Sequence, residues 1–494
     1  MRKEWSLVID ERLFGELHAH LFPGDGDEHG GVIIAGFAET ERGTRLLARQ
    51  FVPARDGVDF VPGKRGYRAL AGHFVAEAAG RCADDELVYL AVHNHGGTDS
   101  VQFSHDDMAS HVRGYPALLD ITNGGPVGAL VFAHNAVAGD IWTVDGQRHA
   151  LHHAQIVGLH PRRLYPEPPA RTKSVDPMYE RQVRLFGEAG QRLLGDLKVG
   201  VIGAGGGGSL LLQMLARLGV GHLVAVDPDR MDITNHPRIV GARRRDIAWG
   251  MMASKNRVIS QLGRRLARPK VYVAQRAARE ANRAVKFDAL YGNIIDAAVA
   301  RQLTDTDFLF LATDTMQSRL VFNALVHQYL VPGIQIGAKV QADPGTGSVH
   351  DVFAVTRLVL PDAGCLLCNG AISSAQLQRE ALSENERQRQ RYIAGEDIPE
   401  PSVITLNALG ASQAMNDFLF IMTGLLKPVQ PEHILISPRE RTVQRVRLQH
   451  DPECPMCSLS PGSLYGRGDR GQLPCRQGPT RRSLCYTWRS ADEA

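Results

Sequence analysis

A glycine-rich turn between an apolar strand and an apolar helix is the feature that most constrains the fold of this 494-residue chain. Residues 198–227 read KVGVIGAGGGGSLLLQMLARLGVGHLVAVD, which predicts a strand, a turn, a helix and a second strand. That alternation indicates a parallel, doubly wound sheet. Asp227 ends the second strand, where a carboxylate can bind ribose hydroxyls. Glycines in such a turn let backbone amides approach phosphates at the helix N-terminus; here they are Gly203, Gly205, Gly206 and Gly208.

Polar residues downstream of the turn favour ATP over a nicotinamide cofactor. Asn235 and Arg238 follow Asp227 closely, and Lys255 comes later. The apolar segment FLFLATD ends in Asp314, which is placed to hold Mg²⁺. Arginine and lysine neutralise polyphosphate charge, and a carboxylate with Mg²⁺ orients the α-phosphate. A hydride-transfer enzyme has no use for this set.

Together these motifs resemble the ubiquitin-activating superfamily of the ThiF/MoeB type over residues 179–457. The resemblance assigns ATP binding to the glycine-rich loop, to Asp227, Asn235, Arg238 and Lys255, and to Thr313-Asp314 with Mg²⁺. The segment RQVRLFG resembles the start of the family domain, in which an arginine reaches into the nucleotide site of a partner subunit. Arg181 is that candidate, so the resemblance implies a homodimer. The implied reaction is adenylation of the C-terminal glycine of a ubiquitin-like protein, with release of pyrophosphate.

A second polar cluster lies in residues 91–107, AVHNHGGTDSVQFSHDD, at the end of an expected strand. His93 and His95 are two residues apart, so their side chains share one face and can reach one ion. An aspartate from the following turn would complete a zinc site with one open position. Glu28 precedes another expected strand and could serve as the base that takes a proton from water.

These residues resemble the JAB/MPN family of zinc isopeptidases over roughly the first 150 residues. The resemblance makes Glu28 the base, makes His93, His95 and Asp107 the zinc ligands, and gives Ser104 a role in holding the oxyanion. Two departures are Gly96, where the family often has proline, and a loop one residue longer than the commonest spacing. Fixed counting would choose Asp106, whereas the Ser-x-x-Asp register favours Asp107. The letters HNH also occur in a nuclease name, but no second ββα metal pattern follows.

Two Cys-x-x-Cys pairs predict a second, structural zinc site. The pairs are 86 residues apart (454 − 368), and each closes a tight knuckle suited to tetrahedral thiolate coordination. ThiF/MoeB-like proteins often carry such a zinc. The alternative is a set of reduced thiols without a ligand. The four predicted ligands are Cys365, Cys368, Cys454 and Cys457.

No catalytic cysteine is assigned from the sequence. The segment expected to cross over the nucleotide site, residues 396–412, contains none. Cys82 lies in the first domain, and Cys475 and Cys485 lie in the C-terminal tail. The acyl-adenylate would pass to a separate conjugating enzyme or sulfur donor, unless a tail cysteine accepts it.

The composition of the chain and the positions of its proline- and glycine-rich segments define the expected domain organisation. We expect a JAB/MPN α/β domain at 1–157, a proline-rich linker at 158–178, a Rossmann-like adenylation domain at 179–457, and a loose tail at 458–494. The formal net charge of +3 gives no argument for nucleic-acid binding. A charged N-terminus without an apolar leader, and no run long enough to span a bilayer, indicate a cytoplasmic protein with no membrane partner.

The two expected sites share one chemistry, because both act at the C-terminal glycine of a ubiquitin-like protein. One would activate its carboxyl group with ATP and Mg²⁺, and the other would cleave after it with zinc, as in bacterial ubiquitin-like conjugation systems. One alternative is activation of a sulfur carrier to a thiocarboxylate. Another, from a different class, is a non-catalytic scaffold that binds a ubiquitin-like tail.

Overall fold

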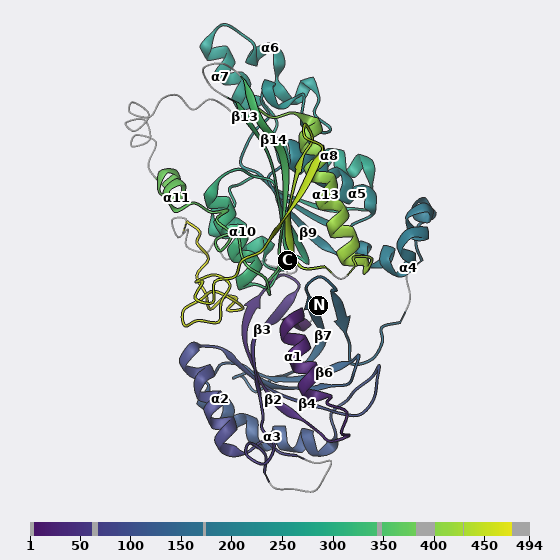
Figure 1. Cartoon of the computed structure of the whole chain (residues 1–494), viewed down its shortest axis with the longest axis vertical. Coiled ribbons are helices and arrows are strands. Elements are labelled where there is room, and N and C mark those ends of the chain that lie inside the picture. The colour runs from purple at the N-terminus through teal and green to yellow at the C-terminus, as the bar shows by residue number, and fades with distance from the viewer. Residues whose placement is uncertain are drawn as a thin grey trace, which may run out of the picture.

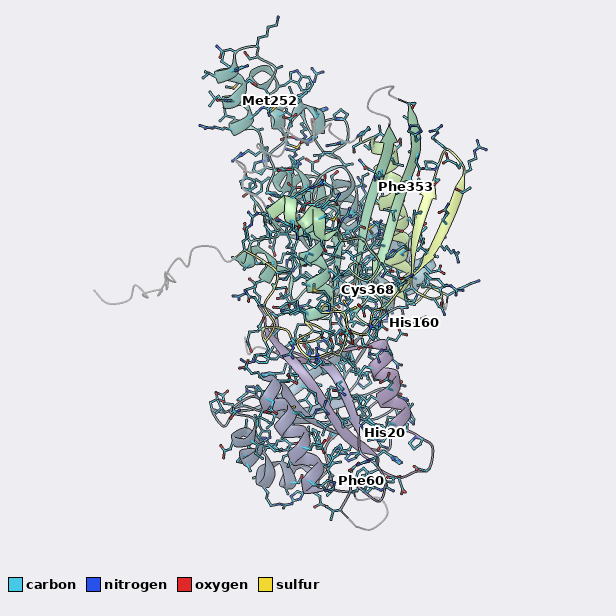
Figure 2. All side chains as sticks on the ribbon, turned by 60° about the vertical axis from the view of Figure 1, so that its left-hand side comes forward. His20, Phe60, His160, Met252, Phe353 and Cys368 are labelled. Atoms are coloured by element: carbon cyan, nitrogen blue, oxygen red, sulfur yellow. The ribbon has the colours of Figure 1, made fainter. Side chains whose placement is uncertain are left out.

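The computed structural model describes residues 4–61, 68–170, 174–342, 348–381, 401–427 and 429–476. The described residues form two mixed α/β halves, each built on an eight-stranded sheet. The N-terminal half lies at the lower end of the molecule and the C-terminal half at the upper end (Figure 1). His20 and Phe60 mark the lower half, and Met252 and Phe353 mark the upper half (Figure 2). No helix in the described ranges has the length and apolar character needed to cross a bilayer.

The first sheet closes on itself. Its strands run in the order β1-β3-β2-β4-β5-β6-β7-β8, and β1 also pairs with β7 in parallel. Helix α1 packs against this sheet through Leu13, Phe14, Leu17 and Leu21, which repeat at helical spacing. The strands are β1 (Glu4–Asp10), β2 (Gly30–Glu39), β3 (Gly43–Pro53), β4 (Val88–Asn94), β5 (Val127–Phe132), β6 (Val137–Trp142), β7 (Arg148–Val157) and β8 (Arg162–Leu164), and the helices are α1 (Glu11–Leu21), α2 (Gly72–Asp85) and α3 (His105–Ile121).

The second sheet is parallel in one half and antiparallel in the other. Strands β11, β10, β9, β12 and β13 are parallel, as the strand–turn–helix pattern predicts. The antiparallel strands β14, β15 and β16 depart from a doubly wound sheet. The connection between β15 and β16, residues 438–441, is too short for a crossover helix. The strands are β9 (Lys198–Ile202), β10 (His222–Val226), β11 (Lys286–Leu290), β12 (Phe308–Leu311), β13 (Gly333–Ala342), β14 (Val349–Val359), β15 (Glu432–Ser437) and β16 (Thr442–Arg447).

Helices cover both faces of the parallel half. Helices α5, α8 and α13 share one apolar core with the sheet, and α10 packs in the other. Helix α4 lies at the side of the upper half, and α6 and α7 lie at its top (Figure 1). The helices are α4 (Glu180–Asp196), α5 (Gly206–Leu218), α6 (Trp249–Met252), α7 (Arg257–Leu266), α8 (Lys270–Ala281), α9 (Ala297–Ala300), α10 (Met316–Gln328), α11 (Ser374–Ala381) and α13 (Ile404–Thr423), with 3₁₀ turns η1 (Pro177–Tyr179), η2 (Ile233–Asn235), η3 (Arg244–Ile247) and η4 (Arg301–Leu303).

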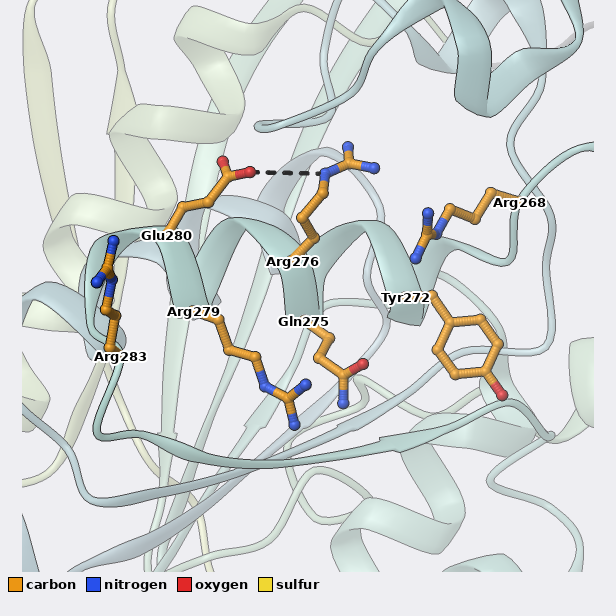
Figure 3. Close-up of a pocket in the computed structure, with 7 residues that line it drawn as sticks. All are labelled: Arg268, Tyr272, Gln275, Arg276, Arg279, Glu280 and Arg283. Carbon is orange, nitrogen blue, oxygen red and sulfur yellow. Dashed lines mark ion pairs between the residues drawn. The ribbon is translucent and has the colours of Figure 1, made fainter.

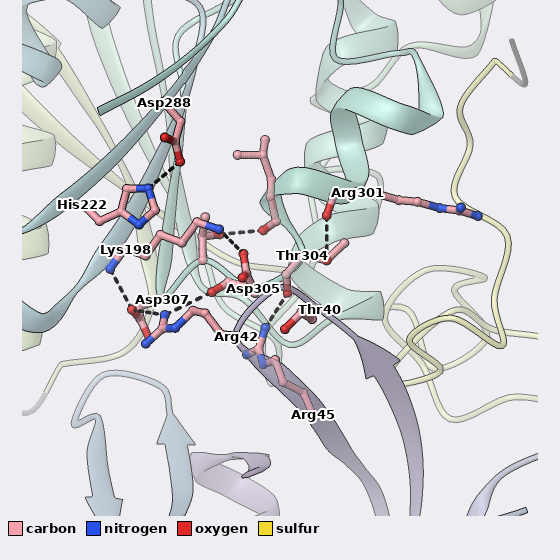
Figure 4. Close-up of polar contacts among 12 residues, drawn as sticks. Thr40, Arg42, Arg45, Lys198, His222, Asp288, Arg301, Thr304, Asp305 and Asp307 are labelled. Carbon is pink, nitrogen blue, oxygen red and sulfur yellow. Dashed lines mark hydrogen bonds and ion pairs between the residues drawn. The ribbon is translucent and has the colours of Figure 1, made fainter. Parts of the chain in front are cut away.

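A buried ionic network joins the two halves (Figure 4). Asp307, 4% exposed, accepts hydrogen bonds from Arg42 at 2.9 Å and from Arg163 at 3.0 Å, both of which come from the first half. The backbone amide of Lys198 donates to the same carboxylate at 2.8 Å. The network places opposite charges in contact where burial would otherwise make each of them costly.

The proline-rich segment and the tail are more ordered than expected. Strand β8 falls within the expected linker and pairs with β7. Residues 458–476, which we call the C-terminal strap, run back to the first half instead of lying loose. Tyr465 is 2% exposed, and its hydroxyl donates to Asp10. The glycine-rich composition that indicated a loose tail instead permits close backbone packing, as where Gly468 pairs with Phe37.

The strap contacts both halves at once. Its amides at Gly466 and Gly468 donate to the carbonyl oxygens of His327 and Gln328 at the end of α10. One residue later, the Asp469 amide donates to Phe37 of β2 at 2.8 Å. The strap therefore fixes the first half against the second.

Candidate functional sites

The first candidate site lies where β4 ends. His93 and His95 are both near the end of this strand, and their Nε2 atoms are 3.2 Å apart. Asp107 lies in the first turn of α3, and its Oδ2 atom is 3.6 Å from His93 Nε2 and 3.4 Å from His95 Nε2. Three ligands about 2.1 Å from a tetrahedral zinc would be about 3.4 Å apart. The three donors therefore fit zinc, and Asp107, not Asp106, is the aspartate in this cluster.

Sheet register brings Glu28 to the same place. Strand β2 pairs with β4 so that Gly30 lies opposite His93, which puts the residues before Gly30 beside the end of β4. Glu28 Oε1 is 3.9 Å from His95 Nε2. Its side chain is partly exposed, at 29%. A carboxylate at this position can reach a water molecule held by the histidines.

Ser104 orients the aspartate. It is the N-cap of α3, and its hydroxyl donates to Asp107 at 2.7 Å while its own amide donates at 2.8 Å. Burial alone would raise the pKa of Asp107, but hydrogen bonds from His93 and His95 outweigh it, and the pKa of Asp107 is lowered. The bond to Asp107 raises the pKa of His95. Asp107 is therefore an ionised carboxylate with a fixed orientation toward the two histidines.

The four predicted cysteines meet in one cluster. The Sγ atom of Cys365 is 3.6 Å from those of Cys368 and Cys454, and Cys368 Sγ is 3.6 Å from Cys457 Sγ. Four sulfurs about 2.3 Å from a tetrahedral zinc would be about 3.8 Å apart. A hydrogen bond from Cys457 lowers the pKa of Cys365, which favours the thiolate that metal binding needs. The cluster fits a structural zinc.

The remaining described cysteines are poor nucleophiles. Cys82 is fully buried, and burial raises its pKa to about 12. Burial raises the pKa of Cys475 to about 11. Cys485 lies outside the described residues. Because the thiolate is the reactive form, neither Cys82 nor Cys475 is suited to accept an acyl group.

The glycine-rich loop forms at the carboxyl end of β9 and leads into α5. Gly203 has a φ of +97°, a conformation that favours glycine. A Cβ atom at Gly203 would lie 2.7 Å from the carbonyl oxygen of Ala312 and 2.8 Å from the Thr313 side chain. A Cβ atom at Gly208 would collide with the Gly203 carbonyl oxygen. The loop and the end of β12 are therefore packed backbone to backbone.

Asp227 holds this loop in place. Its carboxylate is 5% exposed and accepts hydrogen bonds from the amides of Ala204 at 2.7 Å and Asp229 at 2.8 Å. Burial raises the pKa of Asp227. The position at the end of β10, next to the loop, is the one that the sequence predicts for a ribose-binding carboxylate.

Arg238 and Thr313 lie at the loop, and Asp314 follows at the same sheet end. A Cβ atom at Gly206 would be 3.6 Å from Arg238 Cδ. Asn235 is buried and accepts a hydrogen bond from the Asp232 amide at 3.1 Å, so it shapes the turn that carries Arg238. Asp314 is exposed between β12 and α10.

Two residues that the sequence predicts to bind the nucleotide have no recorded contact with the glycine-rich loop. Lys255 is exposed between α6 and α7, and Arg181 is exposed on α4. Within the described part of the chain, neither side chain has a recorded hydrogen bond or ion pair. Their predicted nucleotide contacts remain predictions.

Asn407 was not predicted from the sequence. It lies on α13, and its side-chain nitrogen contacts the position that a Cβ atom of Gly206 would occupy. It also donates to Ser402 at 3.2 Å. Because Asn407 is about two hundred residues from the loop, only the packing of α13 over α5 brings it there. No local sequence pattern signals such a contact.

A model of the ThiF family matches residues 179–456, more than half of the chain. The chain belongs to the ThiF family. It is 25% identical over 299 residues to a sulfur carrier protein adenylyltransferase of Thermus thermophilus, covering 59% of this chain and 93% of that protein. It is 26% identical over 283 residues to a sulfur carrier protein ThiS adenylyltransferase of Bacillus subtilis, covering 56% and 70%. A solved structure of E. coli MccB with ATP aligns at 20% identity with a TM-score of 0.42, covering 57% and 75%.

Membership of the ThiF family explains why these features occur together. The domain is of the ThiF adenylyltransferase type, and ATP is the nucleotide that this family implies. The packed loop, Asp227 and Arg238 lie at the sheet end where Rossmann-like folds bind nucleotides. The match begins at residue 179, after the histidine cluster of the first half.

Proposed function

We propose that this chain activates the C-terminal glycine of a ubiquitin-like protein with ATP and Mg²⁺, and that its first half is a zinc peptidase acting on the same protein. The observation that supports activation most is the loop of Gly203–Gly208 with Asp227 and Arg238 beside it, in a chain of the ThiF family. The carboxylate of the carrier would attack the α-phosphate, and pyrophosphate would leave.

Different residues at the loop would bind the phosphates, the ribose and Mg²⁺. Backbone amides at the start of α5 would bind phosphate oxygens, because a helix N-terminus carries unpaired N–H groups. Arg238 would neutralise negative charge, and Asp227 would accept from ribose hydroxyls. Asp314 would hold Mg²⁺, which supplies further charge neutralisation. Lys255 would reach the phosphates only if the segment between α6 and α7 approaches the loop.

The peptidase proposal rests on the cluster of His93, His95 and Asp107. Zinc held there would act as a Lewis acid toward water and toward a scissile carbonyl group. Glu28 would accept the proton from the attacking water and pass it to the leaving amine. Ser104 keeps Asp107 in position, and its hydroxyl would help to hold the oxyanion. The resemblance to JAB/MPN isopeptidases supports the same assignment.

A second candidate function is activation of a sulfur carrier. The curated names of the Thermus and Bacillus relatives favour it, because both are adenylyltransferases of sulfur carrier proteins. The two candidates differ in the acceptor, which would be a thiol of a conjugating enzyme or a sulfur donor. Both share the adenylation step.

ATP–pyrophosphate exchange tests the proposed activation. The purified chain would be incubated with ATP, labelled pyrophosphate and each candidate small protein that ends in glycine. Exchange that depends on one carrier supports activation, and the same carrier lengthened by a short peptide tests cleavage. A chain that binds the carrier tail but never exchanges pyrophosphate would be a scaffold. The His95→Ala variant should lose cleavage and keep exchange.

A further inference from the structure

Positive charge is concentrated in one segment of the ThiF domain. Residues 238–283 contain eleven arginines and two lysines but only two acidic residues, Asp246 and Glu280. The whole chain has a formal net charge of only +3, so the rest of the chain is net negative. The segment forms η3, α6, α7 and α8. Helices α6 and α7 lie at the top of the upper half, and α8 lies below them (Figure 1). A charge asymmetry of this size indicates a surface that attracts an acidic partner.

The acidic residues of this segment are already paired. Asp246 accepts two hydrogen bonds from Arg276 at 2.7 Å, and Glu280 accepts from Arg243 at 2.6 Å. Arg268, Arg279 and Arg283 are exposed, and within the described residues their guanidinium groups have no recorded hydrogen bond or ion pair. These three groups can therefore bind an external carboxylate without first breaking an internal ion pair.

The three arginines line a concave pocket on the outer side of α8. The pocket has a volume of about 450 Å³, and Tyr272, Gln275 and the pair Arg276–Glu280 complete its lining. Figure 3 shows Tyr272, Gln275 and Arg279 on one side of the helix and Arg276 with Glu280 on the other. Tyr272 is 38% exposed, and its ring offers an apolar surface between the cations. The pocket suits an acidic side chain or two on a protein segment.

An aliphatic stripe lies on α7, the helix that precedes α8 in the chain. Val258, Leu262 and Leu266 are spaced four residues apart, and they are 74%, 47% and 60% exposed. Spacing of four residues places them along one side of the helix. Aliphatic groups gain little beside phosphate backbones, which are bound by polar and charged groups. The concave pocket on α8 also suits a protein segment better than a flat membrane surface.

The position of this surface relates it to the nucleotide site. After β10 the chain passes through η2, η3, α6 and α7 before α8 returns beside β11, which is parallel to β10. In such a crossover the helix begins at the carboxyl end of the strands, so Arg268 and Lys270 lie at the end where the glycine-rich loop lies. A protein bound at α7 and at the start of α8 would be close to the activated carboxyl group, and Arg279 and Arg283 extend the surface along α8 toward the opposite end of the strands.

We propose that α7 and α8 dock an acidic, partly apolar segment of the protein that accepts the activated acyl group. This inference rests on the proposed function. We place the acceptor on a separate molecule because residues 396–412 contain no cysteine and Cys82 is buried in the first half. The cationic face, defined here by Arg268, Arg279 and Arg283 with the stripe on α7, binds that molecule through carboxylates and aliphatic side chains.

A peptide-binding experiment on the full chain tests the docking surface. The probe is a labelled twelve-residue helical peptide with glutamates on one face and leucines on the other, measured by fluorescence anisotropy at several salt concentrations. The test variant is Arg279→Glu/Arg283→Glu. The matched control is Arg441→Glu/Arg447→Glu. It makes the same charge change on exposed residues at β16, the edge strand of the second sheet.

We expect the test variant to bind the peptide at least tenfold more weakly than the wild type, and the control variant to bind within twofold. Val258→Ser/Leu266→Ser should weaken binding at least threefold. Equal binding by the test variant and the wild type would overturn the proposal, as would equal binding of a peptide with serine in place of leucine. Preferential binding of a DNA duplex or of phosphatidylserine vesicles would assign the face to another class of partner. Pyrophosphate exchange is read separately, so failed activation is distinguishable from failed docking.

Discussion

The Asp107 side chain at the first site contacts both the start of α3 and the two histidines. Its carboxylate accepts from Ser104 at the start of α3, and the same oxygen lies within 3.6 Å of both histidines. A residue that caps a helix and faces two imidazoles has a fixed orientation, which is what a metal ligand requires. Asp106 lies in the same turn but outside the cluster.

Replacing each of these neighbouring aspartates separately with asparagine tests the zinc assignment. Asp107→Asn removes the anionic ligand, so the zinc content should fall from two ions per chain to one, with loss of peptidase activity. Asp106→Asn is the matched control and should keep both ions. Metal content is measured by mass spectrometry after gel filtration. Loss of zinc from the Asp106 variant alone would show that the register is wrong.

Asp362 predicts a pH dependence at the boundary between the halves. Burial, with the nearby charge of Asp10, raises the pKa of Asp362 to about 7. In the unfolded chain the same group titrates near 3.8. The folded state therefore binds more protons between these values, so this contribution to stability is fully present at low pH and is lost as the pH rises through about 7.

Asp362→Asn should remove that loss. At pH 8 the variant should be more stable than the wild type by about 1 to 3 kcal/mol. This is less than the free energy equivalent to the whole pKa shift, because the Asp362 side chain is not completely buried. At pH 4 the two proteins should unfold alike. Thermal unfolding at both pH values measures the difference, with Asp120→Asn on the exposed side of α3 as the control. A pH-independent difference would contradict the assignment.

At the scale of elements, the turn between β9 and α5 separates two kinds of glycine. A Cβ atom at Gly208 would collide with the Gly203 carbonyl oxygen, whereas a Cβ atom at Gly205 would meet no atom within 4 Å. The first glycine is needed by the fold, and the second faces open space. If that space accommodates phosphate, the two glycines should differ in what their replacement changes.

Gly208→Ala should lower the unfolding midpoint and abolish exchange, because backbone must move to admit the methyl group. Gly205→Ala should unfold like the wild type yet bind ATP at least tenfold more weakly, since the methyl group occupies space that a phosphate needs. Gly195→Ala, on α4 and also without atoms within 4 Å, is the control and should change neither property. Normal ATP affinity in the Gly205 variant would show that the nucleotide lies elsewhere.

The sequence predicted those elements whose partners are near in the chain. The β9–α5–β10 unit, Asp227 beside the loop, and the approach of His93 to His95 follow from local spacing and periodicity. Asn407 at the loop and Tyr465 on Asp10 could not be predicted, because tertiary packing alone brings them to their partners. The tail shows the same limit of local sequence patterns. Its sequence has no helical or strand periodicity, yet residues 458–476 are held by contacts with residues hundreds of positions away.

At the scale of the whole molecule, a homodimer would complete the nucleotide site. Arg181 is exposed on α4, which lies at the side of the upper half, so it can serve a nucleotide across an interface (Figure 1). A two-fold dimer is the commonest oligomer, and it would give each site one arginine from the partner.

Mixing two inactive variants tests this arrangement. Arg181→Ala and Asp314→Ala should each lack exchange activity as pure preparations. In a mixed dimer one site would receive both defects and the other neither, so exchanging subunits should restore part of the activity. If Arg181 acts within its own chain, nothing is restored. A monomeric mass by light scattering in the active preparation would also exclude the dimer.

The strap joins the cysteine cluster to the boundary between the halves. It begins directly after Cys457, contacts the end of α10, and reaches β2 through Asp469. The Asp469 carboxylate accepts from the Glu39 amide at 2.8 Å and from the Tyr329 hydroxyl at 3.0 Å, so one side chain bonds to both halves. Zinc at the cysteines would hold the start of the strap and thereby limit the freedom of everything that follows it.

Removing that zinc should loosen the first half without unfolding either sheet. In Cys457→Ser, amide hydrogen exchange at Glu39 and Asp469 should accelerate at least tenfold, because the bonds that these amides donate to the Asp469 carboxylate and to the Phe37 carbonyl oxygen open more often. Asp469→Ala should accelerate the same amides with the zinc still bound, by breaking the strap at its far end and leaving the Tyr329 hydroxyl unpaired, at a cost of about 1 to 3 kcal/mol. His95→Ala is the control, since it removes the other zinc and touches no strap residue. Unchanged exchange at Glu39 and Asp469 in the Cys457 variant would mean that the strap holds the halves together by its own contacts, independently of the metal.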